Sequence, residues 1–227
     1  MGAEQSAEHA AAITGFHVLH VSNHSPAFEA GLSPYFDFIV SVNDRFLTEA
    51  DDLILADQIQ QHLGQAIKLG VYSSKERSLR EIQIVPRTGW TDQPHSGALG
   101  CTVRFCDAKS VEANVWHILN VSPDSPAFAA GLQSFDDYIV GTPETAFVNE
   151  MDFSYMVASH VDKPMQLLVY NTKSGSCRQI TITPQRNWGG EGLLGCDIGF
   201  GYLHRIPKSN PTPSVTLPPM ESTTLAN

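Results

Sequence analysis

The stretch VSNHSPAFEAGLSPYFDFIVSVND, residues 21–44, decides the fold, because the chain contains nearly the same stretch twice. The second copy, VSPDSPAFAAGLQSFDDYIVGTPE, covers residues 121–144. Each copy predicts a short helix followed by a strand. In the first copy Ser25 can cap the helix, Pro26 suits its first position and Gly31 suits a left-handed stop. A supersecondary unit repeated over about a hundred residues predicts two similar domains.

The segments around these copies also repeat. In FHVLHV, residues 16–21, Phe16 and Val18 alternate with His17 and Leu19, which is typical of a strand. A helix at about 51–63, two strands, a loop with Gly and Trp, and a last strand at 101–106 follow. The second half has the same order, with a helix at about 150–160 and a last strand at 196–201. We therefore expect a mostly β fold with short helices (α+β).

The repeat and the composition give four segments. Residues 1–14 form an N-terminal arm, 15–107 the first domain and 108–207 the second. Residues 208–227, rich in Pro, Ser and Thr, have few apolar side chains, so we expect a disordered tail.

Composition excludes several classes of function. The net charge of −10 argues against nucleic acid as a partner, because binding to phosphates needs clustered Lys and Arg. No apolar run reaches the ~18 residues of a membrane-spanning helix. The start of the chain does not resemble a secretory signal, so we expect the four cysteines to be free thiols in a reduced compartment. No catalytic motif is present, and we expect no enzymatic activity and no required cofactor.

The phrase SPAFxAGL followed by DxIV resembles the PDZ domain. Such domains bind extended peptides, often C-termini, as an added strand, with a glycine-containing loop holding the carboxylate. Here that loop follows the SPAF phrase instead of preceding it, which implies two tandem circularly permuted PDZ-like domains. The resemblance places the peptide-binding loop residues at Ala98, Leu99 and Gly100 in the first domain and at Leu193, Leu194 and Gly195 in the second.

Longer phrases extend the resemblance to a family. The ending WGGEGLLGCDIGFGYLHRIP, residues 188–207, and the phrases YFDFIVSVN, NVWHILNV, VYNT and CRQITITP resemble the Golgi reassembly and stacking proteins. The resemblance implies a Golgi membrane-tethering scaffold on the cytoplasmic face. It also implies golgin-type coiled-coil partners, self-association between facing membranes and a link to unconventional secretion. The first loop, GWTDQPHSGALG, departs from the family pattern, which puts its peptide preference in doubt.

The start MGAEQS matches the myristoylation pattern, with Gly2 as acceptor and Ser6 at the last motif position. A single myristoyl chain binds membranes with K of only about 10⁴ M⁻¹. A second attachment is therefore needed, and a golgin-type partner or a homo-oligomer formed in trans can supply it.

The resemblance suggests two further sites. Tyr202, Leu203 and Ile206 match apolar positions of self-association, although they can equally pack on their own domain. His17 and Cys106 match a zinc site completed by a partner's cysteines. The sequence itself supplies no close set of the four ligands that zinc prefers, so a strand histidine and a half-buried thiol are the simpler interpretation.

Two alternatives to the tether stay open. The first is a soluble PDZ adaptor or cargo receptor in unconventional secretion, which would use the same grooves without a lipid anchor. The second, a fragment of a PDZ-bearing protease, would need catalytic residues for which we find no motif.

Overall fold

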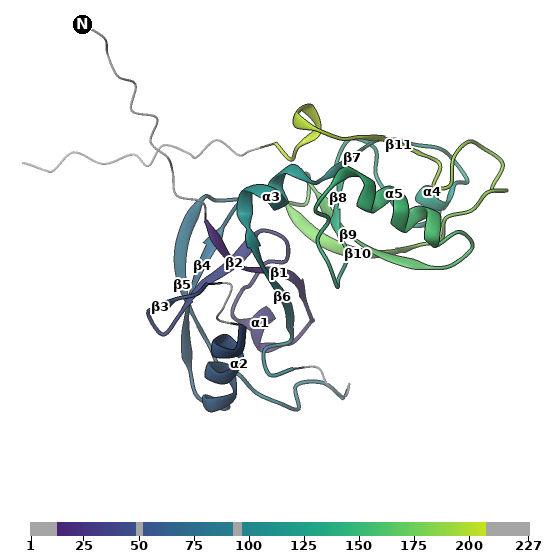
Figure 1. The fold of residues 1–227 in the computed structure, drawn as a ribbon. Coiled ribbons are helices and arrows are strands. Elements are labelled where there is room, and N and C mark those ends of the chain that lie inside the picture. Colours follow the sequence, from purple (N-terminus) through teal and green to yellow (C-terminus); the bar gives the residue numbers. More distant parts are fainter. Residues whose placement is uncertain (1–12, 49–51, 93–96, 208–227) are drawn as a thin grey trace, which may run out of the picture.

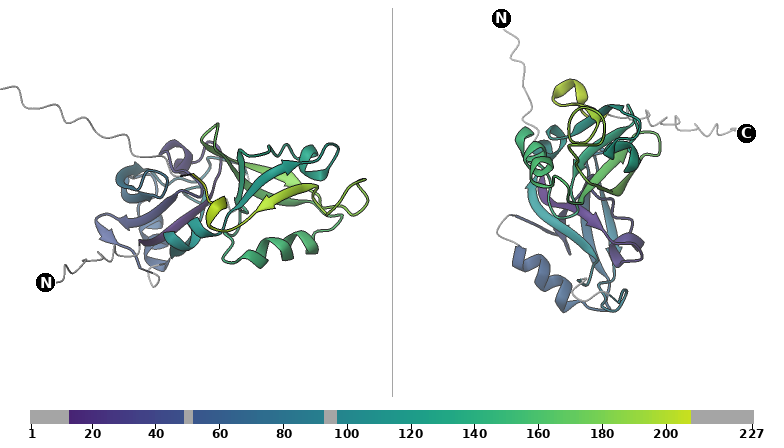
Figure 2. Two further views of the ribbon diagram at one scale, coloured as in Figure 1. Left: turned by 90° about the horizontal axis from the view of Figure 1, so that it is seen from above. Right: turned by 90° about the vertical axis from the view of Figure 1, so that its right-hand side faces the viewer.

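The computed structural model describes residues 13–48, 52–92 and 97–207. Figures 1 and 2 show two domains side by side, the first drawn from purple to teal and the second from teal to yellow. The expected arm and tail lie outside the described residues, apart from Ile13 and Thr14. No helix within the described ranges has both the length and the hydropathy that crossing a membrane requires.

The first domain is built on an antiparallel six-stranded sheet in the order β5-β4-β2-β1-β6, with β3 paired to β2. Its elements are β1 (Thr14–Val21), α1 (Pro26–Glu29), β2 (Asp37–Val42), β3 (Arg45–Phe46), α2 (Asp52–Gln61), β4 (Ile67–Ser73), β5 (Ser78–Ile84) and β6 (Cys101–Asp107).

The second domain repeats the plan with the sheet order β10-β9-β8-β7-β11. Its elements are β7 (Trp116–Val121), α4 (Pro126–Ala129), β8 (Asp137–Gly141), α5 (Glu150–Ser159), β9 (Met165–Asn171), β10 (Ser176–Ile182), β11 (Cys196–Gly199) and the 3₁₀ turn η2 (Tyr202–His204). A helix that the sequence analysis did not predict, α3 (Ala108–Ala113), connects the two domains.

The strand order confirms the permuted topology. The last strand of each domain pairs with the first strand of the same domain and lies at the edge of its sheet: β6 pairs with β1, and β11 with β7. The strand expected at 196–201 is shorter than predicted and ends at Gly199. Gly201, at φ 94°, adopts a backbone conformation that a strand cannot continue through, and η2 starts directly after it.

The repeated SPAF phrase folds as its residues predict. The side chains of Ser25 and Ser125 each accept a hydrogen bond from a backbone N–H three residues later, at 3.1 Å. Gly31, at φ 76°, and Gly131, at φ 75°, then end the two helices in the left-handed region. The local signals in the sequence are therefore sufficient for this part of each domain.

Each domain holds one buried carboxylate at the start of the strand that follows the SPAF helix. Asp37 is 1% exposed and accepts two hydrogen bonds from the Arg80 guanidinium, at 3.0 and 2.5 Å, and one from the Ser33 N–H at 2.7 Å. Arg80 also donates to the Gly31 carbonyl at 3.2 Å. Asp137 and Arg178 repeat this arrangement in the second domain. The pair ties the helix end to two strands.

A third apolar cluster lies between the domains, in addition to one core within each. It joins side chains of the first domain, such as Phe36, to side chains of the second, such as Tyr170, and their rings meet edge to face at 4.8 Å. Residues 16–19 of β1 are all buried, so both faces of this strand are covered. In a sheet with one face in solvent, only every second residue of the strand would be buried. The ammonium group of Lys75 donates across the interface to the Gly175 carbonyl at 2.6 Å.

We predict that Arg80→Met lowers the free energy of unfolding of the first domain by about 3 kcal/mol, because it leaves the Asp37 carboxylate buried without its partner. Arg87→Met is the matched control. Arg87 pairs with Glu29 on the surface, where solvent screens the ion pair and its contribution to stability is small. Urea unfolding followed by fluorescence measures both losses, and equal losses in the two variants would contradict the prediction.

Candidate peptide-binding grooves

A groove of the second domain runs between helix α5 and the edge strand β11. It contains a cavity of about 280 Å³. Helix α5 contributes Phe153, Ser154 and Val157, and the remaining lining comes from the loop and strand at 191–196 and from Ile198. The predicted loop residues Leu193, Leu194 and Gly195 all line this cavity, so the structure brings them together beside a helix and a free sheet edge.

The backbone of this loop is fixed from one side. Its carbonyl groups accept hydrogen bonds from the protein: Leu193 from the Gln185 N–H at 2.8 Å, Leu194 from the Ala127 N–H at 2.9 Å, and Gly195 from the Ser122 N–H at 2.9 Å. Among the described residues, the N–H groups of Leu194 and Gly195 donate to no protein acceptor. Adjacent N–H groups without a protein acceptor form a site for an anion such as a peptide carboxylate.

Gly195 cannot be replaced without moving its neighbours. Its φ is +70°, and a Cβ there would lie 2.3 Å from the Ser125 Cβ and 2.7 Å from the Trp188 ring. Trp188 in turn donates its indole N–H to the Gly192 carbonyl at 2.8 Å, which closes the loop. The glycine thus allows the loop to pack tightly against the start of helix α4 while its N–H side stays available.

The first domain builds the same loop from a different sequence. Gly100 also has φ +70°, and its Cβ would meet Ser25 at 2.3 Å and Trp90 at 2.6 Å. Trp90 donates to the Gly97 carbonyl at 2.9 Å. Within the described part of the chain, the N–H groups of Leu99 and Gly100 likewise donate to no protein acceptor. The loop is therefore closed by its tryptophan although its sequence, GWTDQPHSGALG, departs from the family pattern.

The two loops still differ in ways that bear on specificity. Seven positions separate the tryptophan from its glycine acceptor in the first domain and four in the second. Ala98 stands where the second domain has Leu193, so less apolar surface is offered there. Leu99 and Leu194 are both buried and belong to the cores of their domains.

The outer edges of β6 and β11 have no neighbouring strand in the described sheets, so an extended peptide can pair with either. The first edge differs because a loop of the second domain approaches it. Arg104 on β6 donates to the Thr145 hydroxyl at 3.4 Å. A peptide on β6 would therefore lie close to both domains.

All four cysteines are free thiols, as the sequence predicted. Cys101 and Cys196 open the two groove strands, and burial raises the pKa of each thiol to about 12. At neutral pH such thiols are protonated, which makes them poor nucleophiles.

His17 and Cys106 lie on one face of the sheet, because Gly15 pairs with Cys106 and His17 with Arg104. His17 is 1% exposed, donates from Nε2 to the Tyr35 carbonyl at 2.7 Å and stacks on Phe38. Its Nδ1 is buried without a partner. Within the described residues no three His, Cys, Asp or Glu side chains gather around a metal position. A site that uses only these two residues and is completed by a partner's cysteines is not tested by this search, and it stays a prediction.

The structure separates the three residues predicted for self-association. Tyr202 is 80% exposed and Leu203 is 88% exposed, both on η2. Ile206 packs instead against the cluster between the domains. Only the first two present apolar surface to a second molecule. Gly2 lies outside the described residues.

The sequence analysis missed two parts of the grooves. It gave no role to Trp90 or Trp188, although both hold the loops closed. It also named no individual side chain of the groove helix, where Phe153, Ser154 and Val157 line the cavity. The recurrence of a tryptophan before each glycine loop was a signal that could have indicated the first role.

Comparison with known proteins agrees with this geometry. The model of the GRASP55/65 PDZ-like domain matches residues 3–101 and 69–209. The chain is 45% identical over 213 residues to human Golgi reassembly-stacking protein 1, covering 93% of this chain and 47% of that protein. It is 31% identical over 206 residues to GRASP65 homolog protein 1 of Saccharomyces cerevisiae, covering 78% and 54%. The chain thus spans about half the length of these relatives.

A shorter match joins one domain to a different protein. Over 85 residues the chain is 41% identical to 26S proteasome non-ATPase regulatory subunit 9 of Rattus norvegicus, covering 35% of each chain. This length corresponds to a single repeat unit, so the similarity concerns the domain and not the tandem arrangement.

We predict that Gly195→Ala abolishes peptide binding by the second domain and destabilises it by more than 2 kcal/mol, because backbone strain of about 1–2 kcal/mol adds to the clash with Ser125 and Trp188. Gly192→Ala is the control. Gly192 has a similar φ of +72°, but nothing lies within 4 Å of its Cβ position, so only the strain remains. Thermal unfolding and peptide titration check both variants, and equal destabilisation would count against a tightly packed loop.

We also predict that His17 makes stability depend on pH. Burial lowers the pKa of His17 from 6.5 to about 4, so its contribution is complete above pH 6.5 and is lost as the pH falls toward 4. The unfolded state takes up the proton at a higher pH than the folded state. The resulting loss in the free energy of unfolding is about 3 kcal/mol near pH 4. His17→Gln can still donate to the Tyr35 carbonyl and should lose correspondingly less stability between pH 7 and 4.5. If the free energy of unfolding falls with pH equally in the wild type and in His17→Gln, this role of His17 is refuted.

Proposed function

Because the chain belongs to the GRASP55/65 PDZ-like domain family, we propose that it is a peptide-binding scaffold that links Golgi membranes. One observation supports the binding part most directly. In each domain a closed glycine loop presents N–H groups without protein acceptors beside a free sheet edge. This arrangement suits the C-terminal carboxylate and the extended backbone of a peptide.

We expect two kinds of partner. A golgin-type coiled-coil protein would supply a C-terminal peptide to one groove, and another copy of the chain would engage through the exposed side chains of Tyr202 and Leu203. Each contact is modest by itself. Many copies on facing membranes raise the overall strength through effective concentration, without requiring any new contact.

The attachment to the membrane would be the acyl group on Gly2. One myristoyl chain gives only marginal binding, so attachment depends on a partner or a second copy as well. The scaffold would then lie on the cytoplasmic face of Golgi membranes, and its stay there would depend on its contacts.

The proposed anchor and the proposed groove are tested separately. Gly2→Ala should move the chain from the membrane fraction to the supernatant of fractionated cells, whereas Ala10→Gly in the same arm should leave it in place. Intact mass establishes whether the acyl group is present. A chain that is not acylated and still functions in cells would instead favour an adaptor in unconventional secretion that needs no anchor.

For the groove, Ser154→Trp should weaken binding of peptides with apolar C-termini at least tenfold, because the indole enters the cavity beside Leu194. Ser159→Trp, on the same helix but outside the cavity lining, is the control. Amidating the peptide's C-terminus should cause a similar loss in the wild type. Tight binding of the amidated peptide would exclude carboxylate recognition by the loop.

A further inference from the structure

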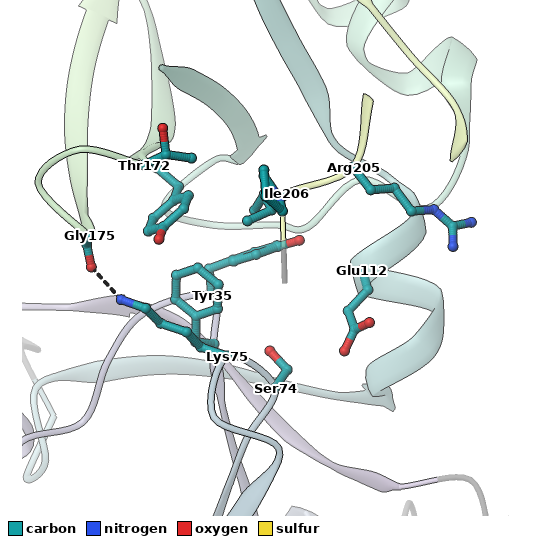
Figure 3. A pocket seen from close by; sticks show the side chains of 11 residues that line it. Tyr35, Ser74, Lys75, Glu112, Thr172, Gly175, Arg205 and Ile206 are labelled. Carbon is teal, nitrogen blue, oxygen red and sulfur yellow. Dashed lines mark hydrogen bonds between the residues drawn. The ribbon is translucent and has the colours of Figure 1, made fainter. Parts of the chain in front are cut away.

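A cavity of about 390 Å³ lies between the two domains, apart from both grooves (Figure 3). Its apolar walls come from both domains and from the end of the described chain: Tyr35, Phe36, Tyr170, Ile206 and Pro207. Ligand sites of globular proteins have volumes of about 300–1,000 Å³, are lined mainly by apolar and aromatic side chains, and often occur at domain interfaces. The cavity matches this description.

Positive charge flanks the apolar walls. The Lys75 ammonium group lies 5.5 Å from the centroids of both the Phe36 and Tyr170 rings and donates to the Gly175 carbonyl. Arg205, whose guanidinium lies 5.3 Å from the Tyr202 ring, also lines the cavity. Glu112 is the acidic side chain in the lining. A suitable occupant therefore has an apolar body, with acidic groups next to it.

The N-terminal arm starts close to this cavity. Ile13, the first described residue, packs against the cluster that forms the cavity walls. Its carbonyl accepts from the Ala108 N–H at 3.0 Å at the start of α3, and Glu112 near the end of α3 lines the cavity. A helix of this length extends about 9 Å. Ile13, where the arm joins the first domain, is therefore separated from the cavity by about the length of helix α3.

The arm is also long enough and carries suitable charge. The eleven peptide units that link Gly2 to Ile13 can span up to about 36 Å when extended. The arm contains Glu4 and Glu8, which complement Lys75 and Arg205. A myristoyl chain needs on the order of 400 Å³ if each carbon takes about the 30 Å³ share of a water molecule in the liquid. This volume is close to that of the cavity.

We propose that the acyl chain on Gly2 occupies the cavity between the domains when the protein is not on a membrane. The inference rests on the acylation in the proposed function. The bound chain is shielded from water, and it competes with insertion into the bilayer. Because a single myristoyl chain binds bilayers only marginally, even modest binding in the cavity shifts the balance toward the detached form. A partner on the membrane then shifts it back.

The test uses the full chain acylated by a co-expressed N-myristoyltransferase, with intact mass as a check, and phosphatidylcholine vesicles. Ser74→Trp should fill the cavity, whose lining includes Ser74, and raise vesicle binding about fivefold or more relative to the acylated wild type. Ser78→Trp, at an exposed position of the same hairpin and outside the lining, should behave as wild type. Without the acyl group the three proteins should bind vesicles equally poorly.

A second measurement does not depend on any variant. A myristoyl chain with a ¹³C-labelled methyl group should show nuclear Overhauser contacts to Tyr170 and Ile206 in the acylated wild type without vesicles. Contacts of these two residues with the chain beyond Pro207 instead, or no contacts together with unchanged vesicle binding of Ser74→Trp, would overturn the inference.

Failure of acylation itself is distinguishable. If intact mass shows a bare Gly2, the anchor in the proposed function fails. The cavity is then tested with a myristoylated peptide of residues 2–12 added to the full-length Gly2→Ala chain. Binding that Ser74→Trp blocks and Ser78→Trp does not would support the cavity as an acyl site, and no binding would refute it.

Discussion

The grooves depend on one close contact, that between a glycine and a serine–tryptophan pair. At Gly195 the Ser125 Cβ and the Trp188 ring occupy the space that any side chain would need, and Gly100 has the same surroundings in the first domain. The contact joins the start of the SPAF helix to the glycine loop. Because the loop carbonyls are bonded to the protein on that side, the N–H groups remain available on the other side. Function at the groove is thus a consequence of packing behind it.

The cluster between the domains adds a second constraint, because it fixes the relation of the two grooves. The hydrogen bond from Lys75 to Gly175 joins the β4–β5 connection to the corresponding β9–β10 connection, and Phe36, just before β2, meets Tyr170 of β9 edge to face. A scaffold that binds two ligands at once gains from such fixed geometry, since the second binding event is then governed by a defined distance. The same cluster leaves the cavity that we assign to the acyl chain.

The sequence predicted what is local and missed what depends on the docking of the domains. Helix caps at Ser25 and Ser125 and left-handed glycines follow from short patterns that repeat, and the permuted strand order was implied by the resemblance to PDZ domains. Burial of both faces of β1 and the packing of Ile206 depend on contacts between residues far apart in the chain. The hydrogen bond from the Tyr35 hydroxyl to the Val111 carbonyl, 76 positions away, is one such contact. No periodicity within one unit could indicate it. Helix α3 does carry a local signal, the Asp107 side chain that accepts from the Lys109 N–H, and the sequence analysis overlooked it.

The glycine loops and edge strands of the two domains differ, which suits binding of different ligands. Both loops keep the same closure and the same left-handed glycine, so the carboxylate binding that we propose would be open to both. Their side chains differ, with Ala98 opposite Leu193 and a longer connection after Trp90 than after Trp188. Within the described residues, the other domain approaches the first edge strand through the hydrogen bond from Arg104 to Thr145. A ligand of the first groove therefore meets both domains, whereas a ligand of the second meets mainly its own. Under the proposed function, the two units would thus bind the peptide carboxylate in the same way but would select different peptide side chains.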